Sequence, residues 1–170
     1  MVNLTGVGMS GMIDIGRHTE MPIHAHRAGW GALTRDPLLG WSYPAWSKLW
    51  RLAGADHMHV NGFDNKFTES NESVAASVAS LKDPLFGNSP MCAVPVFSSG
   101  QTVRQAAATL NAAGSPDVLV TAGGGIIAHP DGVTEGVKAM RQAYDAAMQG
   151  VDVDVYAKEY HELTAALAAF

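Results

Sequence analysis

Five short apolar segments, each followed by a segment of helical periodicity, constrain the fold of this chain more than any other feature. The apolar segments are rich in Val and Ile and are bounded by Gly, Pro, Ser or Asp, which is typical of strands. They lie at residues 2–5, 22–25, 57–60, 92–98 and 117–122. The helical segments lie at residues 10–17, 42–52, 71–81, 102–113, 134–148 and 156–169. This alternation predicts an α/β fold with a parallel sheet and helical crossovers.

Each predicted strand finishes with polar residues or glycine. Residues two apart on a strand share a side, so His24 and His26, and likewise His57 and His59, each present two imidazoles to one face. The other strands end in Asn3 and Thr5, in Ser98 to Gly100, and in Thr121 with Gly123 to Gly125. Polar residues at the same end of every strand favour a parallel barrel over an open doubly wound sheet. Five βα units are too few for a complete barrel, so we expect part of a (β/α)8 barrel enzyme.

Two glycine-containing segments after the fourth and fifth strands are candidates for phosphate binding. Gly123, Gly124 and Gly125 leave backbone N–H groups unobstructed by a Cβ, and a following helix adds the positive end of its dipole. Ser98 to Gly100 lies in the same position after the fourth strand. The simpler interpretation of either segment alone is a tight turn that requires glycine. Two such segments at neighbouring strand ends favour phosphate binding.

The segment 61–67 after the third strand contains Gly62 and Lys66. Such loops hinge at glycine and close over substrates, and a lysine at the tip brings positive charge onto a carboxylate or enolate. The alternative for Lys66 is a solvated surface side chain.

The four strand-end histidines also allow two other interpretations. Together they could form a zinc site, as in metal-dependent hydrolases, although no Asp ends the final strand as those enzymes require. Alternatively, His24 and His57 are hydrogen-bonded core residues.

Composition excludes several functional classes. Eleven Lys and Arg against sixteen Asp and Glu give a net charge of −5, and no basic stripe is present, so we expect no nucleic-acid partner. No apolar run approaches about 18 residues, so we expect no membrane partner, and no secretory leader is visible. Cys92 is the single cysteine and cannot form an internal disulfide, which fits a reducing compartment such as the cytoplasm.

Several motifs in order resemble the C-terminal half of the RuBisCO large-subunit barrel, strands four to eight, over nearly the whole chain. They are His24 to Ala28, Gly54 to His59, Lys66, Ser98 to Gly100 and Gly123 to Gly125. The runs from His26 to Arg35 and from Leu49 to Gly54, and the segment from His59 to Phe67, are more similar to RuBisCO-like proteins of sugar-acid catabolism. These include the 3-oxo-isoapionate-4-phosphate decarboxylases. Ser99 in place of glycine, and Gln101 with Thr102 in place of Ile-His, depart from the carboxylase pattern.

The resemblance implies roles for eight residues. His26 and Lys66 match catalytic residues: a histidine that shuttles protons, and a loop lysine that faces the transferred or departing carboxyl group. Arg27 and His59 match ligands of one phosphate. The remaining residues match substrate or phosphate contacts: Ser98, Gly100, Gly123 and Gly124. These assignments agree with the interpretation of the glycine segments from their residues alone.

The resemblance further implies a Mg²⁺-dependent lyase that decarboxylates a phosphorylated sugar acid through an enediolate. Its metal ligands are a carbamylated lysine, an aspartate and a glutamate expected upstream of this chain, which itself supplies no metal ligand. The N-terminal domain and the first barrel strands are also expected outside residues 1–170, and the full-length form is expected to be a homodimer. On this view the chain by itself neither binds Mg²⁺ nor turns over substrate.

Three alternatives remain open. Within the same superfamily, the protein is a ribulose-bisphosphate carboxylase or an enolase or isomerase of a ketose phosphate. From another class, the chain is a non-catalytic, phosphate-binding half-barrel that needs a partner chain.

Overall fold

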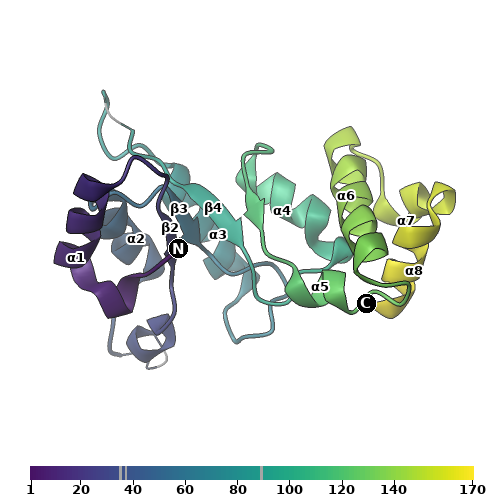
Figure 1. The fold of residues 1–170 in the computed structure, drawn as a ribbon, viewed down its shortest axis with the longest axis horizontal. Helices are drawn as coiled ribbons and strands as arrows, with labels where there is room; N and C mark the ends of the chain where they lie inside the picture. The colour runs from purple at the N-terminus through teal and green to yellow at the C-terminus, as the bar shows by residue number, and fades with distance from the viewer. Residues whose placement is uncertain (35, 37, 89) are drawn as a thin grey trace. The chain divides into compact units, whose positions relative to one another are not determined.

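The computed structural model describes residues 1–34, 36, 38–88 and 90–170, so Arg35 of the family-like run lies outside the described residues. The described residues form two compact units. The first unit comprises Met1–Val60 with Ala75–Val96, and the second comprises Asn61–Val74 with Phe97–Phe170. Figure 1 shows the helices and strands of both units, coloured along the chain.

Short parallel strands build the sheet of the first unit. The strands are β1 (Val2–Asn3), β2 (His24–His26), β3 (His57–His59) and β4 (Val94–Phe97). β1 pairs with β2, β2 with β3, and β3 with β4, all in parallel. Ile23 and Asp56 fix the start of β2 against β3, because the Ile23 N–H donates to the Asp56 carboxylate at 2.6 Å and the Asp56 N–H donates to the Ile23 carbonyl at 3.1 Å.

Three helices accompany these strands: α1 (Leu4–His18), α2 (Tyr43–Leu52) and α3 (Asn71–Lys82), of which α3 belongs to the first unit from Ala75 onward. Helix α2 begins where the Ser42 hydroxyl accepts the Ala45 N–H at 3.4 Å, the usual arrangement of an N-cap. Tyr43, Trp46 and Trp50 recur at helical spacing on one face of α2, and all three are buried. Trp30, which follows β2, packs against Tyr43 and Trp46 and completes an aromatic cluster.

The second unit is mainly helical. Its elements are α4 (Ala106–Ala113), β5 (Leu119–Val120), α5 (Gly123–Ile127), α6 (Val133–Gln149), α7 (Val153–Tyr156) and α8 (His161–Ala169). The Thr121 N–H donates to the carbonyl of Phe97, the last residue of β4, at 2.8 Å, and the strand order is β1-β2-β3-β4-β5. Ala139, Ala143, Leu163 and Ala166 are fully buried in the core between α6 and α8.

The predicted α/β fold with a parallel sheet is confirmed. Each of the five strands overlaps the apolar segment that predicted it and is shorter than that segment, and β2 is shifted so that it ends at His26 rather than at Ala25. The predicted segment 102–113 is a 3-10 turn followed by α4. Among the described residues, no helix has the length and apolar character needed to cross a membrane.

Three elements differ from the predictions. Helix α1 begins at Leu4 rather than residue 10, because the Asn3 side chain caps it by accepting the Gly6 N–H at 3.4 Å, so Thr5 is helical. It kinks at Gly8, whose φ is +74°, and the predicted segment 10–17 lies in the part after the kink. The glycine run does not precede a helix but forms the first turn of α5. The C-terminal helix is divided, since Tyr160 adopts an extended conformation between α7 and α8.

Candidate active site

The strand-end histidines of the first unit lie against one another, whereas the alternating pattern predicted only that each pair shares a face. The Nε2 atoms of His24 and His59 are 2.8 Å apart, a hydrogen-bonding distance. The ring centroids of His26 and His59 are 4.4 Å apart, and those of His24 and His57 are 5.9 Å apart. The parallel register of β2 against β3 produces this arrangement, because it sets His24 opposite His57.

Burial keeps His59 neutral. Desolvation, followed by the nearby charges of His26, His24 and Arg27, lowers the pKa of His59 to about 4. Burial is also the main cause that lowers the pKa of His24, with His57 as the next cause. In the His24–His59 contact one imidazole nitrogen donates and the other accepts, which requires a neutral ring. At neutral pH, His59 therefore acts through hydrogen bonding rather than as a fixed positive charge.

The main chain selects the tautomer of His26. The Ala28 N–H donates to Nδ1 of His26 at 3.0 Å, so the neutral ring carries its proton on Nε2. The Arg27 guanidinium carbon lies 4.6 Å from the ring centroid of Tyr43, a cation–π distance. The first unit thus brings together three of the predicted site residues, His26, Arg27 and His59.

Lys66 and the segment after β4 are held together in the second unit. The Lys66 N–H donates to the Ser99 carbonyl at 3.0 Å, and a Cβ built on Gly100 would lie 3.5 Å from the Cβ of Lys66. The Gln101 side chain donates to the Phe63 carbonyl at 3.1 Å and lies directly against Gly62. The Lys66 side chain is exposed, with its Nζ 5.5 Å from the ring centroid of Phe67. Lys66, Ser98 and Gly100 therefore belong to one local arrangement.

Ser99 is stabilised in a conformation that usually requires glycine. Its φ is +71°, in the left-handed region, and the next residue, Gly100, has a φ of +95°. The Ser99 hydroxyl donates to Oδ1 of Asn61 at 2.7 Å and lies 3.2 Å from the Ser98 hydroxyl. This hydrogen bonding offsets the conformational cost, which is of order 1 kcal/mol. It accounts for a serine at the position where the family pattern has glycine.

The three glycines of α5 occupy different environments. A Cβ on Gly125 would lie 2.5 Å from the Gln101 carbonyl oxygen and 3.0 Å from the Cα of Thr102. Gly123 and Gly124 are exposed, and a Cβ on either would have no neighbour within 4 Å. The third glycine therefore packs α5 against the segment after β4, while the first two leave their main chain open.

The arrangement of the strand-end histidines bears on the zinc alternative. Within residues 1–34, 36, 38–88 and 90–170, no group of three or more His, Cys, Asp and Glu side chains is placed to hold an ion. His24 and His59 face each other through Nε2, whereas zinc ligands direct these nitrogens at a common ion. The strand-end histidines therefore do not fit the zinc alternative, and the Mg²⁺ ligands that the resemblance implies are expected outside this chain.

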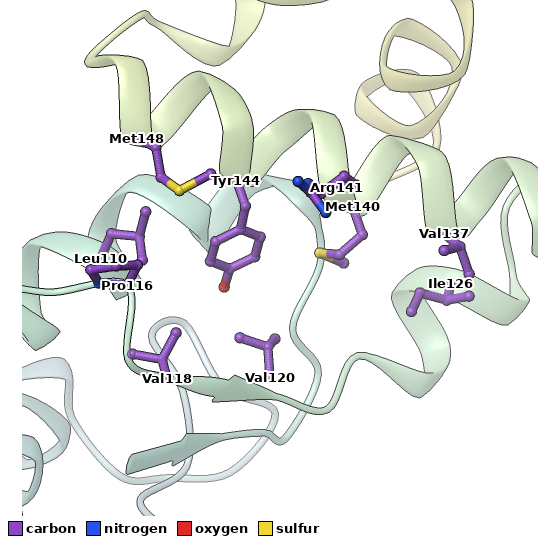
Figure 2. Close-up of a pocket in the computed structure, with 10 residues that line it drawn as sticks. All are labelled: Leu110, Pro116, Val118, Val120, Ile126, Val137, Met140, Arg141, Tyr144 and Met148. Atoms are coloured by element: carbon purple, nitrogen blue, oxygen red, sulfur yellow. The ribbon is translucent and has the colours of Figure 1, made fainter. Parts of the chain in front are cut away.

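A separate apolar cavity of about 430 Å³ lies in the second unit, and the motif analysis did not find it. Figure 2 shows the Tyr144 ring projecting from α6 toward Val118 and Val120, with Met148 beside it. Burial is the main cause that raises the pKa of Tyr144. The apolar residues of α6 at positions 133, 137, 140, 144 and 148 were a helical stripe that could have indicated this surface. None of the predicted site residues lines the cavity.

Sequence reasoning also missed Tyr43 and Arg51. The Tyr43 hydroxyl donates to the His59 carbonyl, and Arg51, only 2% exposed, donates to several main-chain carbonyls of the first unit. In the sequence both residues look like ordinary members of an amphipathic helix, because the residues that they contact are distant in sequence.

Comparison with known proteins assigns the chain to one family. Residues 1–170 match the family described as ribulose bisphosphate carboxylase large chain, catalytic domain. The chain is 54% identical over 167 residues to the 3-oxo-isoapionate-4-phosphate transcarboxylase/hydrolase of Xanthobacter autotrophicus, covering 98% of this chain and 40% of that protein. It is 40% identical to the 3-oxo-isoapionate-4-phosphate decarboxylase of Rhizobium etli, covering 100% of this chain and 41% of that protein.

Solved structures agree with the sequence matches. A rubisco-like protein from Burkholderia fungorum superposes with a TM-score of 0.96 at 43% identity, covering 99% of this chain and 42% of that chain. The octameric ribulose-1,5-bisphosphate carboxylase/oxygenase of Pyrococcus horikoshii gives a TM-score of 0.88 at 32% identity, covering 98% of this chain and 40% of that chain. The chain spans about two-fifths of the length of the relatives it matches.

Proposed function

Since this chain belongs to the family of the ribulose bisphosphate carboxylase large-chain catalytic domain, we propose that it forms the substrate-binding part of a RuBisCO-like lyase. The proposed reaction is decarboxylation of a phosphorylated sugar acid through an enediolate. The names of the Xanthobacter and Rhizobium relatives, which act on a phosphorylated oxo sugar acid, support this substrate class. The activity of the whole enzyme is part of the proposal, because the chain matches only about two-fifths of each relative.

The observation that carries the proposal is the attachment of the Lys66 loop to the segment after β4. The hydrogen bond from the Lys66 N–H to the Ser99 carbonyl holds the lysine beside Ser98 and Gly100. In the proposed reaction the Lys66 ammonium neutralises the carboxylate that leaves as CO2, while the C–C bond electrons pass to the neighbouring ketone oxygen. An enolase or isomerase has no carboxyl group for a lysine to hold there.

The remaining predicted residues bind and protonate the substrate in this proposal. His26 holds a proton on Nε2 and delivers it to the enediolate. Arg27, with neutral His59 as a hydrogen-bonding partner, binds one anionic group. Ser98, Gly100 and the open main chain of Gly123 and Gly124 bind the second.

Three further points of the proposal concern the whole protein. Magnesium would be bound by residues outside this chain. The full-length form would be a homodimer, and relatives of known structure include a dimeric archaeal enzyme from Hyperthermus butylicus. The location would be the cytoplasm.

A chimera tests this function directly. This chain would replace the matching stretch of the Rhizobium etli relative, which is named a decarboxylase and to which it is 40% identical. CO2 release and products would be measured with 3-oxo-isoapionate 4-phosphate. We expect CO2 release, and a loss of about a hundredfold or more in kcat for Lys66→Met, because the carboxylate then lacks its countercharge.

Lys48→Met provides the matched control, because Lys48 is an exposed lysine on α2 and outside the site. Product formation without CO2 would contradict decarboxylation in favour of transcarboxylase, hydrolase or isomerase chemistry. CO2 uptake with ribulose bisphosphate would identify a carboxylase. A folded chimera that binds inorganic phosphate but forms no product would favour the non-catalytic half-barrel.

A further inference from the structure

Tyr43 contacts both of the residues proposed to bind one anionic group in the first unit. Its hydroxyl donates to the main-chain carbonyl of His59, the last residue of β3. The Arg27 guanidinium carbon lies 4.6 Å from its ring centroid. One side chain therefore meets Arg27 through its face and His59 through its hydroxyl.

The ring of Tyr43 is itself fixed. It is 4% exposed, and its centroid lies 5.4 Å from that of Trp30 in an edge contact and 5.6 Å from that of Trp46. Tyrosine reaches such a position with only two side-chain torsions, and a packed aromatic cluster leaves few alternatives to it. The Ser42 cap holds the main chain at the start of α2, where Tyr43 lies.

The two contacts act on different parts of the proposed site. Stacking on a fixed ring restricts the plane of a guanidinium, which decides whether its N–H groups meet an oxyanion in a planar pair. A hydrogen bond to the last carbonyl of β3 restricts the main chain from which the His59 side chain departs. Because His59 is neutral near pH 7, the Arg27 charge supplies the attraction, so the orientation of Arg27 has the larger effect.

We propose that Tyr43 is a positioning residue that aligns Arg27 and His59 on a single phosphate group of the substrate. This inference rests on the proposed function, because it assumes that Arg27 and His59 bind that group. It adds a residue from α2 that acts through Arg27 and His59.

Inorganic phosphate binding by the chain tests the inference. We expect Tyr43→Leu, which removes ring and hydroxyl, to weaken phosphate binding about tenfold. Tyr43→Phe keeps the ring and the packing volume and should weaken binding about threefold through loss of one hydrogen bond. Trp50→Phe is the matched control, because Trp50 lies in the same buried cluster, 5.5 Å from Trp46.

The NMR resonance of the Arg27 Nε–H provides a readout that a purely structural role would not move selectively. Stacking over an aromatic ring shifts this resonance, so the shift should persist in Tyr43→Phe and Trp50→Phe and disappear in Tyr43→Leu. Equal weakening of phosphate binding by Trp50→Phe and Tyr43→Leu would overturn the inference. Phosphate binding as tight as in the unsubstituted chain, in both Tyr43→Leu and Tyr43→Phe, would also overturn the inference.

Arg27→Gln distinguishes failure of the inference from failure of the proposed function. If Arg27→Gln binds phosphate as tightly as the unsubstituted chain, Arg27 is not a phosphate ligand, and both the assigned site and the inference are wrong. If Arg27→Gln weakens binding while Tyr43→Leu does not, the site stands and the positioning role of Tyr43 is wrong.

Discussion

The polar groups at the ends of β2 and β3 differ in kind from those that follow β4 and β5. In the first unit the groups are side chains in mutual contact, such as His24 and His59. In the second unit much of the candidate binding surface is main chain, exposed because Gly123 and Gly124 have no Cβ. In the proposed site, binding by the first unit therefore depends on which side chains are present, whereas binding by the second depends on Lys66 and on main chain that glycine leaves open. The first unit also buries one charged side chain, Arg51, whereas Arg104 and Lys138 of the second unit are exposed.

The largest expected effect comes from the buried charge of the first unit. Arg51 donates to the Met91 carbonyl at 2.7 Å and the Pro90 carbonyl at 3.2 Å, and also to the Ser80 carbonyl. Arg51→Met leaves these acceptors without their donor, and we expect the free energy of unfolding to fall by about 4 kcal/mol. Urea unfolding followed by tryptophan fluorescence measures this, because all four tryptophans lie in the first unit.

Arg104→Met is the counterpart in the second unit. Arg104 is exposed and donates to the Leu167 carbonyl at 2.5 Å. In Arg104→Met, water can hydrogen-bond to the Leu167 carbonyl in place of the arginine, so we expect the free energy of unfolding to fall by only about 1 kcal/mol. Amide hydrogen exchange in α8 measures this loss. Equal losses for the two arginines would show that the contrast in burial does not control stability.

The second effect is a pH dependence of the free energy of unfolding, which follows from the buried histidines. An unfolded histidine titrates near 6.5, whereas the pKa of His59 in the fold is about 4. Between these values the unfolded chain binds a proton that the native chain does not. Stability is therefore full above pH 6.5 and falls as the pH decreases toward 4, by about 3 kcal/mol. Tryptophan fluorescence during urea unfolding at a series of pH values measures the slope of the free energy of unfolding against pH.

His59→Gln is the control for this slope, because glutamine has no proton to gain in that range. The lowered pKa of His24 contributes a dependence of the same sign, so the variant should flatten the slope in part. A slope unchanged by His59→Gln would show that His59 is not the group responsible.

The third effect separates glycines that are adjacent in sequence. Gly125→Ala places a Cβ 2.5 Å from the Gln101 carbonyl oxygen, and the resulting shift should cost about 2 kcal/mol. The Cβ added by Gly123→Ala has no neighbour within 4 Å. This variant should preserve stability, since alanine is favoured over glycine in helices by about 1 kcal/mol. Thermal unfolding compares the two variants. Gly123→Ala should still weaken phosphate binding, whereas binding as tight as in the unsubstituted chain would remove Gly123 from the proposed site.

Local patterns were sufficient to predict the order of the elements and the first-unit histidines. Alternation with period two on adjacent parallel strands is enough to bring His24, His26 and His59 to one face. Arg51 and Tyr43 were not predictable in the same way, because their roles arise from partners 16 to 40 residues away, such as the His59 and Met91 carbonyls. The glycine run shows the same limit: three identical residues differ only through what packs against Gly125.

The placement of the β4 and β5 segments also depended on contacts that a sequence pattern does not contain. Lys66 was predicted to lie at a loop tip, but its N–H bond to Ser99 follows from the left-handed conformation of Ser99, which the Asn61 side chain stabilises. The serine looked like a departure from a glycine pattern. In the structure this serine adopts a left-handed conformation that usually requires glycine.

The smallest expected effect concerns the surface ion pairs of the second unit. Lys138 Nζ lies 2.9 Å from Glu135 and 3.8 Å from Glu162, and its side chain is 51% exposed. Solvent and salt screen such pairs, and ordering two long side chains offsets their attraction. Lys138→Met should therefore leave the exchange rates of α8 amides almost unchanged, with any difference vanishing at about 0.5 M salt. Arg141→Met, which removes the exposed Arg141–Asp145 pair, is the matched variant. A loss of stability for Lys138→Met as large as that for Arg51→Met would mean that surface charge stabilises the second unit as strongly as buried charge stabilises the first. The contrast drawn between the two units would then be wrong.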